Sequence, residues 1–187
     1  MSAQLSARSG GWPSFAQRIV RAAKLDVHLY EEVEADTGAT RQAMAVVALS
    51  SVAAGLGVGR WQLGGIVIGV VLTLIGWVIW AYLTYWIGTR LLPEPQTRAS
   101  HGELLRTIGF ATSPGMIRVL GVIPGVRELA FLAAGIWGLI ATVIAVRQAL
   151  DYRSTVRAIG VCAIGWVVQM VLVALTFYLM RATAGPA

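Results

Sequence analysis

Four carboxylates close together form the most polar patch of the chain: Glu31, Glu32, Glu34 and Asp36. Carboxylates at this density can pair with arginines, recruit a basic protein segment or hold a cation. We expect pairing within the protein, because many arginines lie in the short connections between the apolar blocks of the chain. These blocks are expected to cross a membrane, and the connections in question lie on the same side of it as the carboxylates. The candidate partners are Arg90, Arg98, Arg147 and Arg153.

Arg118 is the second residue with unusual chemistry, because it lies in an otherwise apolar stretch. An arginine at the centre of a membrane helix costs about 2.5 to 3.5 kcal/mol on insertion scales. Its long apolar stem lets the charge extend toward the membrane surface, which is our expectation here. The alternative is contact with an anionic ligand.

The sequence contains none of the common enzyme signatures, since it lacks GxSxG, HExxH, P-loop and CxxC patterns. His28 and His101 lie far apart, and the only cysteine, Cys162, is in an apolar block. Gln169, deep in the last block, is expected to form a hydrogen bond between helices. We therefore predict no catalytic, metal-binding or cofactor-binding residue, and no enzyme activity.

A membrane domain must position these residues. Hydrophobic residues make up 57% of the 187 residues and charged residues 13%, whereas soluble domains average about 25% charged residues. No charged side chain occurs from Leu63 to Gly88, a stretch that as a helix exceeds the hydrocarbon core of about 30 Å. The net charge of +6 comes from arginines that flank such blocks, so nucleic acid is not expected as a partner.

The predicted fold is all-α, a polytopic bundle of five transmembrane helices with the third broken at Pro114. Residues 1–42 form an N-terminal segment without the apolar core of a signal peptide, residues 43–180 the transmembrane domain and residues 181–187 a short tail. The predicted spans are 43–59, 63–88, 102–123, 129–146 and 158–180. In the N-terminal segment, apolar and basic residues alternate with helical spacing from Ser14 to Tyr30. This amphipathic helix lies either on an anionic membrane surface or on the protein's own loops.

The third span is the irregular one. Ser100 and Glu103 match a capping box that starts a helix, and Pro114 interrupts it. Gly102 to Ile123 can cross as a broken helix, or it can re-enter and leave four spans.

The arginine distribution predicts a cytoplasmic N-terminus. With five spans, only Arg60, Arg127 and Arg181 flank the spans on the opposite side. The cations on the N-terminal side are Arg8, Arg18, Arg21, Lys24, Arg41, Arg90, Arg98, Arg106, Arg147, Arg153 and Arg157. Five spans place the C-terminus outside the cytoplasm and four place it inside. The preference for arginine over lysine fits a GC-rich genome and a prokaryotic source. The expected location is therefore the bacterial plasma (inner) membrane.

Two motifs carry a family resemblance. Gly109-Phe110-Ala111-Thr112-Ser113-Pro114 resembles the Gly-Tyr-x-x-x-Pro signature of Yip-domain proteins, and Leu29-Tyr30 resembles their Asp-Leu-Tyr-Gly-Pro motif. The stretches from Tyr30 to Asp36 and from Gln148 to Tyr152 resemble the compact prokaryotic branch. The chain departs from the pattern where Glu31 and Glu32 replace Gly and Pro and where Phe110 replaces Tyr. The resemblance implies five closely spaced spans; the eukaryotic members bind small GTPases.

We therefore expect a non-enzymatic scaffold or adaptor that binds partners, or organises the membrane, through its cytoplasmic face. Its expected partners are the lipid bilayer, a protein at that face and a second copy of itself, without any cofactor. A small transporter or lipid flippase subunit that uses the broken third helix and Arg118 is the alternative. The candidate interaction residues are Leu29, Tyr30, Glu31, Glu32, Glu34, Asp36, Gly109, Phe110, Pro114, Arg118, Asp151 and Tyr152.

Overall fold

The computed structural model describes residues 11–59 and 62–183, and every regular element in these ranges is a helix. The elements are α1 (Gly11–Ala23), α2 (Val27–Ala35), α3 (Ala39–Gly57), α4 (Leu63–Trp86), the π-helix η1 (Ile87–Leu91), α5 (His101–Ala111), the 3-10 helix η2 (Ser113–Val122), α6 (Arg127–Ala149) and α7 (Thr155–Thr183). Residues 1–10 of the predicted N-terminal segment, residues 184–187 of the tail and Arg60 lie outside the described residues.

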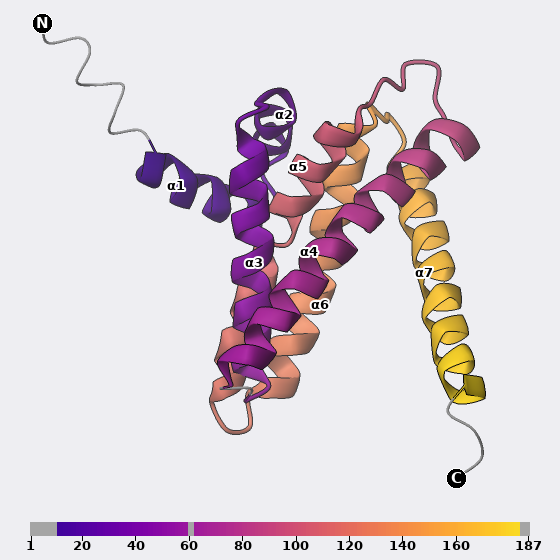
Figure 1. Ribbon diagram of the computed structural model, residues 1–187. Coiled ribbons are helices and arrows are strands. Elements are labelled where there is room, and N and C mark those ends of the chain that lie inside the picture. Colours follow the sequence, from indigo (N-terminus) through magenta and orange to yellow (C-terminus); the bar gives the residue numbers. More distant parts are fainter. Residues whose placement is uncertain (1–10, 60–61, 184–187) are drawn as a thin grey trace, which may run out of the picture.

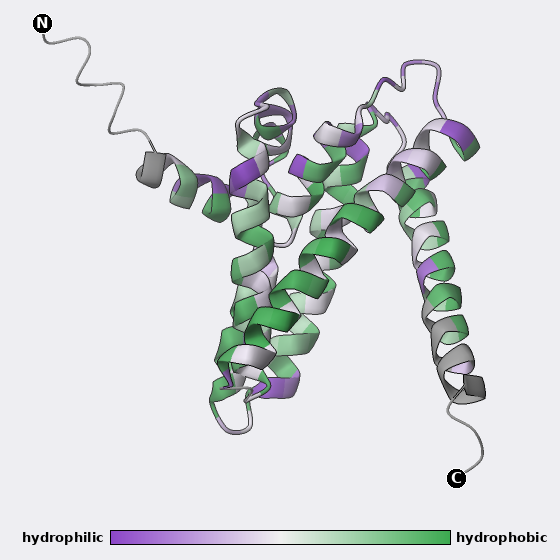
Figure 2. Cartoon of the chain, viewed as in Figure 1, coloured by the Kyte–Doolittle hydropathy of each residue, from purple (hydrophilic) through white to green (hydrophobic). Residues whose placement is uncertain are grey.

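Four described helices are long and apolar enough to cross a membrane. They are Ala39–Gly57, Leu63–Leu91, Arg127–Ala149 and Thr155–Leu172. The first three coincide with predicted spans within four residues at either end, and the fourth overlaps the predicted span 158–180 but ends eight residues earlier. Apolar residues cover the long helices, whereas polar residues gather at the end that carries α2 and the connection from η1 to α5 (Figure 2).

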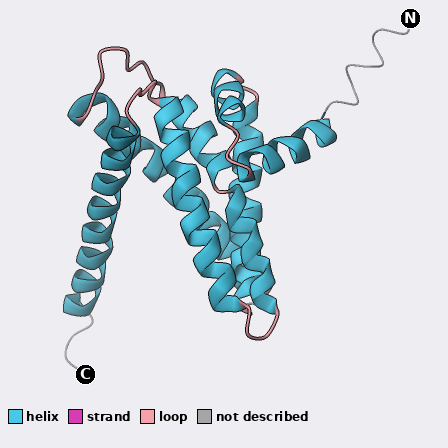
Figure 3. Ribbon diagram, turned by 180° about the vertical axis from the view of Figure 1, so that it is seen from behind, coloured by secondary structure: helices cyan, strands magenta, loops and turns pink. Residues whose placement is uncertain are grey.

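The chain passes repeatedly between the two ends of the bundle (Figure 1). α3 runs away from the α2 end, α4 returns, α5 and η2 together run away again, and α6 returns. Beyond its first turns α7 diverges from the other helices, as the opposite view also shows (Figure 3). The core therefore lies among α2, α3, α5 and α6 and extends to the second half of α4 and the first turns of α7, with small residues such as Ala43 and Ala145 fully buried.

The N-terminal segment differs from the single helix predicted from Ser14 to Tyr30. α1 ends at Ala23, and Leu25 has a left-handed backbone with φ 61°. The side chain of Asp26 then accepts a 3.1 Å hydrogen bond from the backbone N–H of His28 and caps α2. The prediction was wrong because the local cap at Asp26 ends one amphipathic pattern and starts another.

The helical segment from α5 to η2 changes type in its middle. At its start, the predicted capping box is confirmed, since Ser100 and Glu103 exchange both hydrogen bonds. The α-helix ends at Ala111, and Pro114 lies in the first turn of the 3-10 helix that follows. The side chains of Thr112 and Ser113 donate to the carbonyl oxygens of Gly109 and Phe110, at 2.8 and 2.6 Å. These bonds give an additional donor to carbonyls at the end of an α-helix, where the regular backbone hydrogen bonds stop.

Candidate functional site

The apolar side of α2 anchors this short helix to the bundle. Leu29, Tyr30 and Val33 are fully buried, and the Tyr30 hydroxyl donates a 3.2 Å hydrogen bond to the carbonyl oxygen of Ala22. Burial raises the pKa of Tyr30, so this phenol stays neutral. Leu29 and Tyr30 therefore fix the position of α2 and do not reach its surface.

Arg106 of α5 holds the C-terminal end of α2. It is only 6% exposed, and its Nε donates a 2.8 Å hydrogen bond to the carbonyl oxygen of Val33. A terminal nitrogen of the same guanidinium donates to the carbonyl oxygen of Glu34. These carbonyls belong to the last turn of α2, where an arginine is favourable both as a donor and as a positive charge.

The acidic residues of α2 pair with arginines of α1. Arg18 contacts Glu32 at 2.8 Å and Asp36 at 2.9 Å, and its side chain is 15% exposed. Arg21 contacts Asp26 at 2.7 Å and Glu32 at 2.6 Å. These arginines hold the pKa values of Asp26, Glu32 and Asp36 below their ordinary range. The pairing predicted for the acidic patch is present, but the partners named for it were wrong: they are Arg18 and Arg21.

These ion pairs bear on one of the two placements expected for the amphipathic helix, the one on the protein itself. The basic side of α1 faces α2, and Ala22 is fully buried against the core. Phe15 and Ile19 are partly buried and pack on the same core. α1 therefore packs on the protein itself.

Four further carboxylates form a group that we call the acidic surface: Glu31, Glu34, Glu103 and Asp151. Glu31 is exposed and accepts a 3.0 Å hydrogen bond from the side chain of Gln148. Glu34 is half-buried, and no ion pair to its carboxylate is found among the described residues. Burial and the charges of Asp151, Glu103 and Glu31 raise the pKa of Glu34 to about 7. α2, α5 and the connection from α6 to α7 thus bring negative charge together.

Tyr152 fixes that connection to the end of η1. Its side chain is buried, and its hydroxyl lies 2.9 Å from the carbonyl oxygen of Gly88 and 2.7 Å from that of Leu92. Burial, with the charge of Glu94, raises the pKa of Tyr152 to about 12. Glu94 in turn accepts hydrogen bonds from the backbone N–H groups of Arg153 and Ser154, at 3.0 and 3.3 Å. Tyr152 therefore positions Asp151, its exposed neighbour.

The Gly109–Pro114 segment lies inside the bundle, away from the acidic surface. Phe110 and Pro114 are buried. A Cβ atom at Gly109 would lie 2.7 Å from the Cβ of Ala43 and 3.2 Å from Cζ2 of Trp77. Glycine is thus required for α5 to approach α3 this closely.

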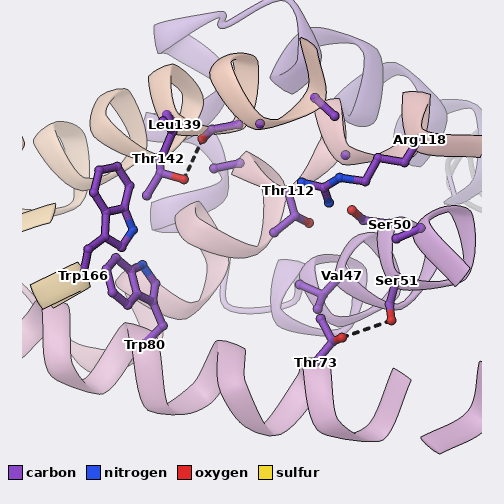
Figure 4. Close-up of a pocket in the computed structure, with 16 residues that line it drawn as sticks. Val47, Ser50, Ser51, Thr73, Trp80, Thr112, Arg118, Leu139, Thr142 and Trp166 are labelled. Atoms are coloured by element: carbon purple, nitrogen blue, oxygen red, sulfur yellow. Dashed lines mark hydrogen bonds between the residues drawn. The ribbon is translucent and has the colours of Figure 1, made fainter. Parts of the chain in front are cut away.

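Arg118 lines a cleft within the bundle (Figure 4). Its guanidinium carbon lies 5.9 Å from the ring centroid of Phe131, and no ion pair to it is found in the described parts of the chain. The expected hydrogen bond of Gln169 is not found among these residues either; its side chain is exposed and borders an adjoining cavity. Gln169 lies in the part of α7 that diverges from the bundle, and this cavity separates its side chain from the residues of α3, α4, α5 and α6 that line the other walls.

The predicted candidates therefore divide into two groups. Leu29, Tyr30, Glu31, Glu32, Glu34, Asp36, Asp151 and Tyr152 lie at the α2 end, whereas Gly109, Phe110, Pro114 and Arg118 lie inside the bundle. Sequence reasoning missed Arg106 as a functional residue. The available signal was an arginine between Leu104 and Ile108, on the apolar side of a capped helix. Within the described ranges, no three histidine, cysteine or acidic side chains are placed to share a metal ion.

Comparison with known proteins gives one match. The family model of the Yip1 domain matches residues 36–176. No curated protein and no solved structure matches the chain.

Proposed function

The chain belongs to the Yip1-domain family, and from this premise we propose that it is a non-enzymatic scaffold of the membrane that recruits a protein partner at its α2 end. The acidic surface is the observation that carries this proposal. Its carboxylates come from three separate elements, and Arg106, Tyr30 and Tyr152 hold those elements in fixed positions. A rigid, negatively charged surface favours a basic segment as the partner.

The proposed topology has five crossings, with the third formed by α5 and η2 and broken at Pro114. α5 has 11 residues and η2 has 10. At about 1.5 and 2.0 Å per residue they extend over roughly 16 and 20 Å, enough for a core of about 30 Å. Residues 1–42 would then form a cytoplasmic segment, residues 43–180 the transmembrane domain and residues 181–187 a tail outside the cytoplasm. The arginine-rich connections at the α2 end support a cytoplasmic location for it, in a bacterial plasma membrane.

The partner would contact the exposed carboxylates of the acidic surface and of the neighbouring residues that pair with Arg18 and Arg21. Glu31 and Asp151 are exposed, and Glu32 remains 40% exposed beside its arginines. Glu34 and Asp36 would add negative charge at the edge of the contact. Leu29 and Tyr30, on the buried side of α2, keep this helix in place. Single exposed charge pairs contribute only about 0 to 1 kcal/mol, so several carboxylates must act together.

Site-specific photocrosslinking in native membranes tests this proposal. A photoreactive amino acid at His28, which is exposed on α2, should give a discrete protein adduct. The double variant Glu31→Lys, Asp151→Lys should abolish this adduct. Glu128→Lys, at an exposed position near the opposite end of the bundle, is the matched control and should leave it unchanged. An adduct that contains only lipid or a second copy of the chain would reject the recruitment of a separate partner.

A further inference from the structure

A cleft of about 470 Å³ opens within the membrane-spanning part of the bundle. This volume is within the range of roughly 300 to 1,000 Å³ that is usual for ligand sites. Arg118 and Ser50 lie toward one end, and the indoles of Trp80 and Trp166, with centroids 6.3 Å apart, lie toward the other (Figure 4). A second cavity shares Thr73, Trp80 and Thr142 with it, so the two adjoin.

Arg118 points into this cleft, contrary to the expectation that it extends toward the membrane surface. Its backbone carbonyl oxygen packs on Gly57, the last residue of α3, near the end of the bundle. Its guanidinium instead turns toward the middle, because Nη1 would lie 3.1 Å from a Cβ atom at Gly115, one helical turn earlier. Figure 4 shows the side chain directed toward Ser50 and Thr112.

Two hydrogen-bond donors converge here, and neither donates to another group among the described residues. A Cβ atom at Gly115 would also collide with the Ser50 hydroxyl, so this hydroxyl and the guanidinium flank the same glycine. Within the described residues neither the Ser50 hydroxyl nor the Arg118 guanidinium has a hydrogen-bond acceptor. The Thr112 hydroxyl is not available as a third donor, because it donates to the carbonyl oxygen of Gly109 at 2.8 Å.

The charge of Arg118 is not balanced by the cleft itself. No acidic side chain is among the described residues that line either cavity. An arginine charge inside a membrane costs several kcal/mol unless an anion or water compensates it. The rest of the lining consists of apolar, aromatic and neutral polar side chains, which suits an amphiphile with a single negative charge.

We propose that this cleft binds the phosphate group of an anionic glycerophospholipid, with Arg118 and Ser50 as donors to the phosphate oxygens. The bilayer supplies such a ligand at high local concentration. Acyl chains would leave the cleft where α7 diverges from α4 (Figure 1), past side chains that are exposed and apolar, such as Leu72 and Val167. Since no acidic group lines the cleft, a lipid whose head group also carries an ammonium gains nothing from that charge. The site should therefore favour phosphatidylglycerol over phosphatidylcholine.

Lipid titration of the detergent-purified full chain, followed by native mass spectrometry, tests the proposal. Phosphatidylglycerol should bind more tightly than phosphatidylcholine or diacylglycerol. Arg118→Gln should weaken phosphatidylglycerol binding by about tenfold or more, because a charge-assisted hydrogen bond is lost. Arg127→Gln, at an exposed arginine outside the cleft, is the matched control and should bind as the unaltered protein does.

A steric variant keeps the test valid if Arg118→Gln fails to fold. Gly135 lines the cleft, and a Cβ atom there meets nothing within 4 Å, so the side chain of Gly135→Leu should extend into the cleft. It should weaken phosphatidylglycerol binding several-fold. Gly64→Leu, at an equally open position outside the cleft, should not.

Three results would overturn the proposal. One is equal affinity for phosphatidylglycerol and phosphatidylcholine in the unaltered protein. Another is tight binding of phosphatidylglycerol that both Arg118→Gln and Gly135→Leu leave intact. The third is displacement of the lipid by millimolar inorganic phosphate. This result would mean that Arg118 and Ser50 bind a soluble anion and not a lipid.

Discussion

The Nε atom of Arg106 lies 2.8 Å from the carbonyl oxygen of Val33, across 73 positions of the sequence. This contact joins the end of α2 to the first half of α5, and the adjacent contact to Glu34 strengthens it. The acidic surface exists as one unit because α2 cannot rotate while Arg106 holds its last turn. The contact therefore links the fold of the bundle to the surface that we propose for recruitment.

Replacing Arg106 should release α2 from the bundle. Arg106→Gln removes two charge-assisted hydrogen bonds, and we expect the free energy of unfolding to fall by about 2 to 4 kcal/mol. Digestion with lysyl endopeptidase measures the local effect, because Lys24, between α1 and α2, is the only lysine. Cleavage should become several-fold faster. Arg98→Gln, at an exposed arginine, should not change the rate; equal rates in all three proteins would contradict the role of Arg106.

Glu34 should make the α2 end less stable as the pH rises. Its pKa is about 7 in the folded chain, against an ordinary value of 4.5, so the folded state binds more protons between these pH values. The stability that Glu34 contributes is then fully present below about pH 4.5 and is lost as the pH rises through 7. Thermal unfolding of the protein in detergent at pH 5 and pH 8 measures this decline.

Glu34→Gln is the variant that isolates this titration. It should reduce the difference in melting temperature between pH 5 and pH 8 and raise the melting temperature at pH 8. The groups that act on Glu34 are Glu31, Glu103, Asp151 and Arg106, and all remain in this variant. An unchanged pH dependence would show that another group is responsible.

Arg18 should matter more than Arg21 for the attachment of α1. The Arg18 side chain is 15% exposed and reaches Glu32, Asp36 and Gln42, whereas Arg21 is 38% exposed. Since less exposed ion pairs are screened less by water and salt, Arg18→Ala should speed cleavage at Lys24 more than Arg21→Ala. The reverse order would contradict the arrangement of these ion pairs.

A side chain at Gly109 should be tolerated only when the facing side chain of α3, that of Ala43, is removed. Gly109→Ala places its methyl group against Ala43 and Trp77, and overpacking of this kind costs about 1 to 3 kcal/mol. Adding Ala43→Gly should recover part of the lost stability, measured as melting temperature. Gly138→Ala, where a Cβ atom meets nothing within 4 Å, is the control. A double variant no more stable than Gly109→Ala would mean that the two positions are not in contact.

The sequence predicted those features that depend on local patterns. Uncharged runs placed the long helices, and Ser100 with Glu103 predicted a cap that the structure contains. The break at Leu25 could not be predicted, because leucine rarely adopts a positive φ and no glycine marks the turn. The contacts of Arg106 and the inward direction of Arg118 depend on distant residues, Val33 and Gly57, that the sequence does not connect. The partners of the acidic residues were missed for a simpler reason: α1 folds back onto α2, and the prediction treated both as one straight helix.

Topology mapping tests the central claim, that α5 and η2 cross the membrane and place the two ends of the bundle on opposite sides. The chain has a single cysteine, Cys162, which is buried, so a Cys162→Ala background allows single cysteines to be labelled. With a membrane-impermeant maleimide on intact spheroplasts, Glu128→Cys should be labelled, while Glu31→Cys and Asp151→Cys should react only after lysis. A reporter fused after Ala187 should be active outside the cytoplasm. Labelling of Glu128→Cys only after lysis, together with a cytoplasmic reporter, would contradict the five crossings and the account built on them.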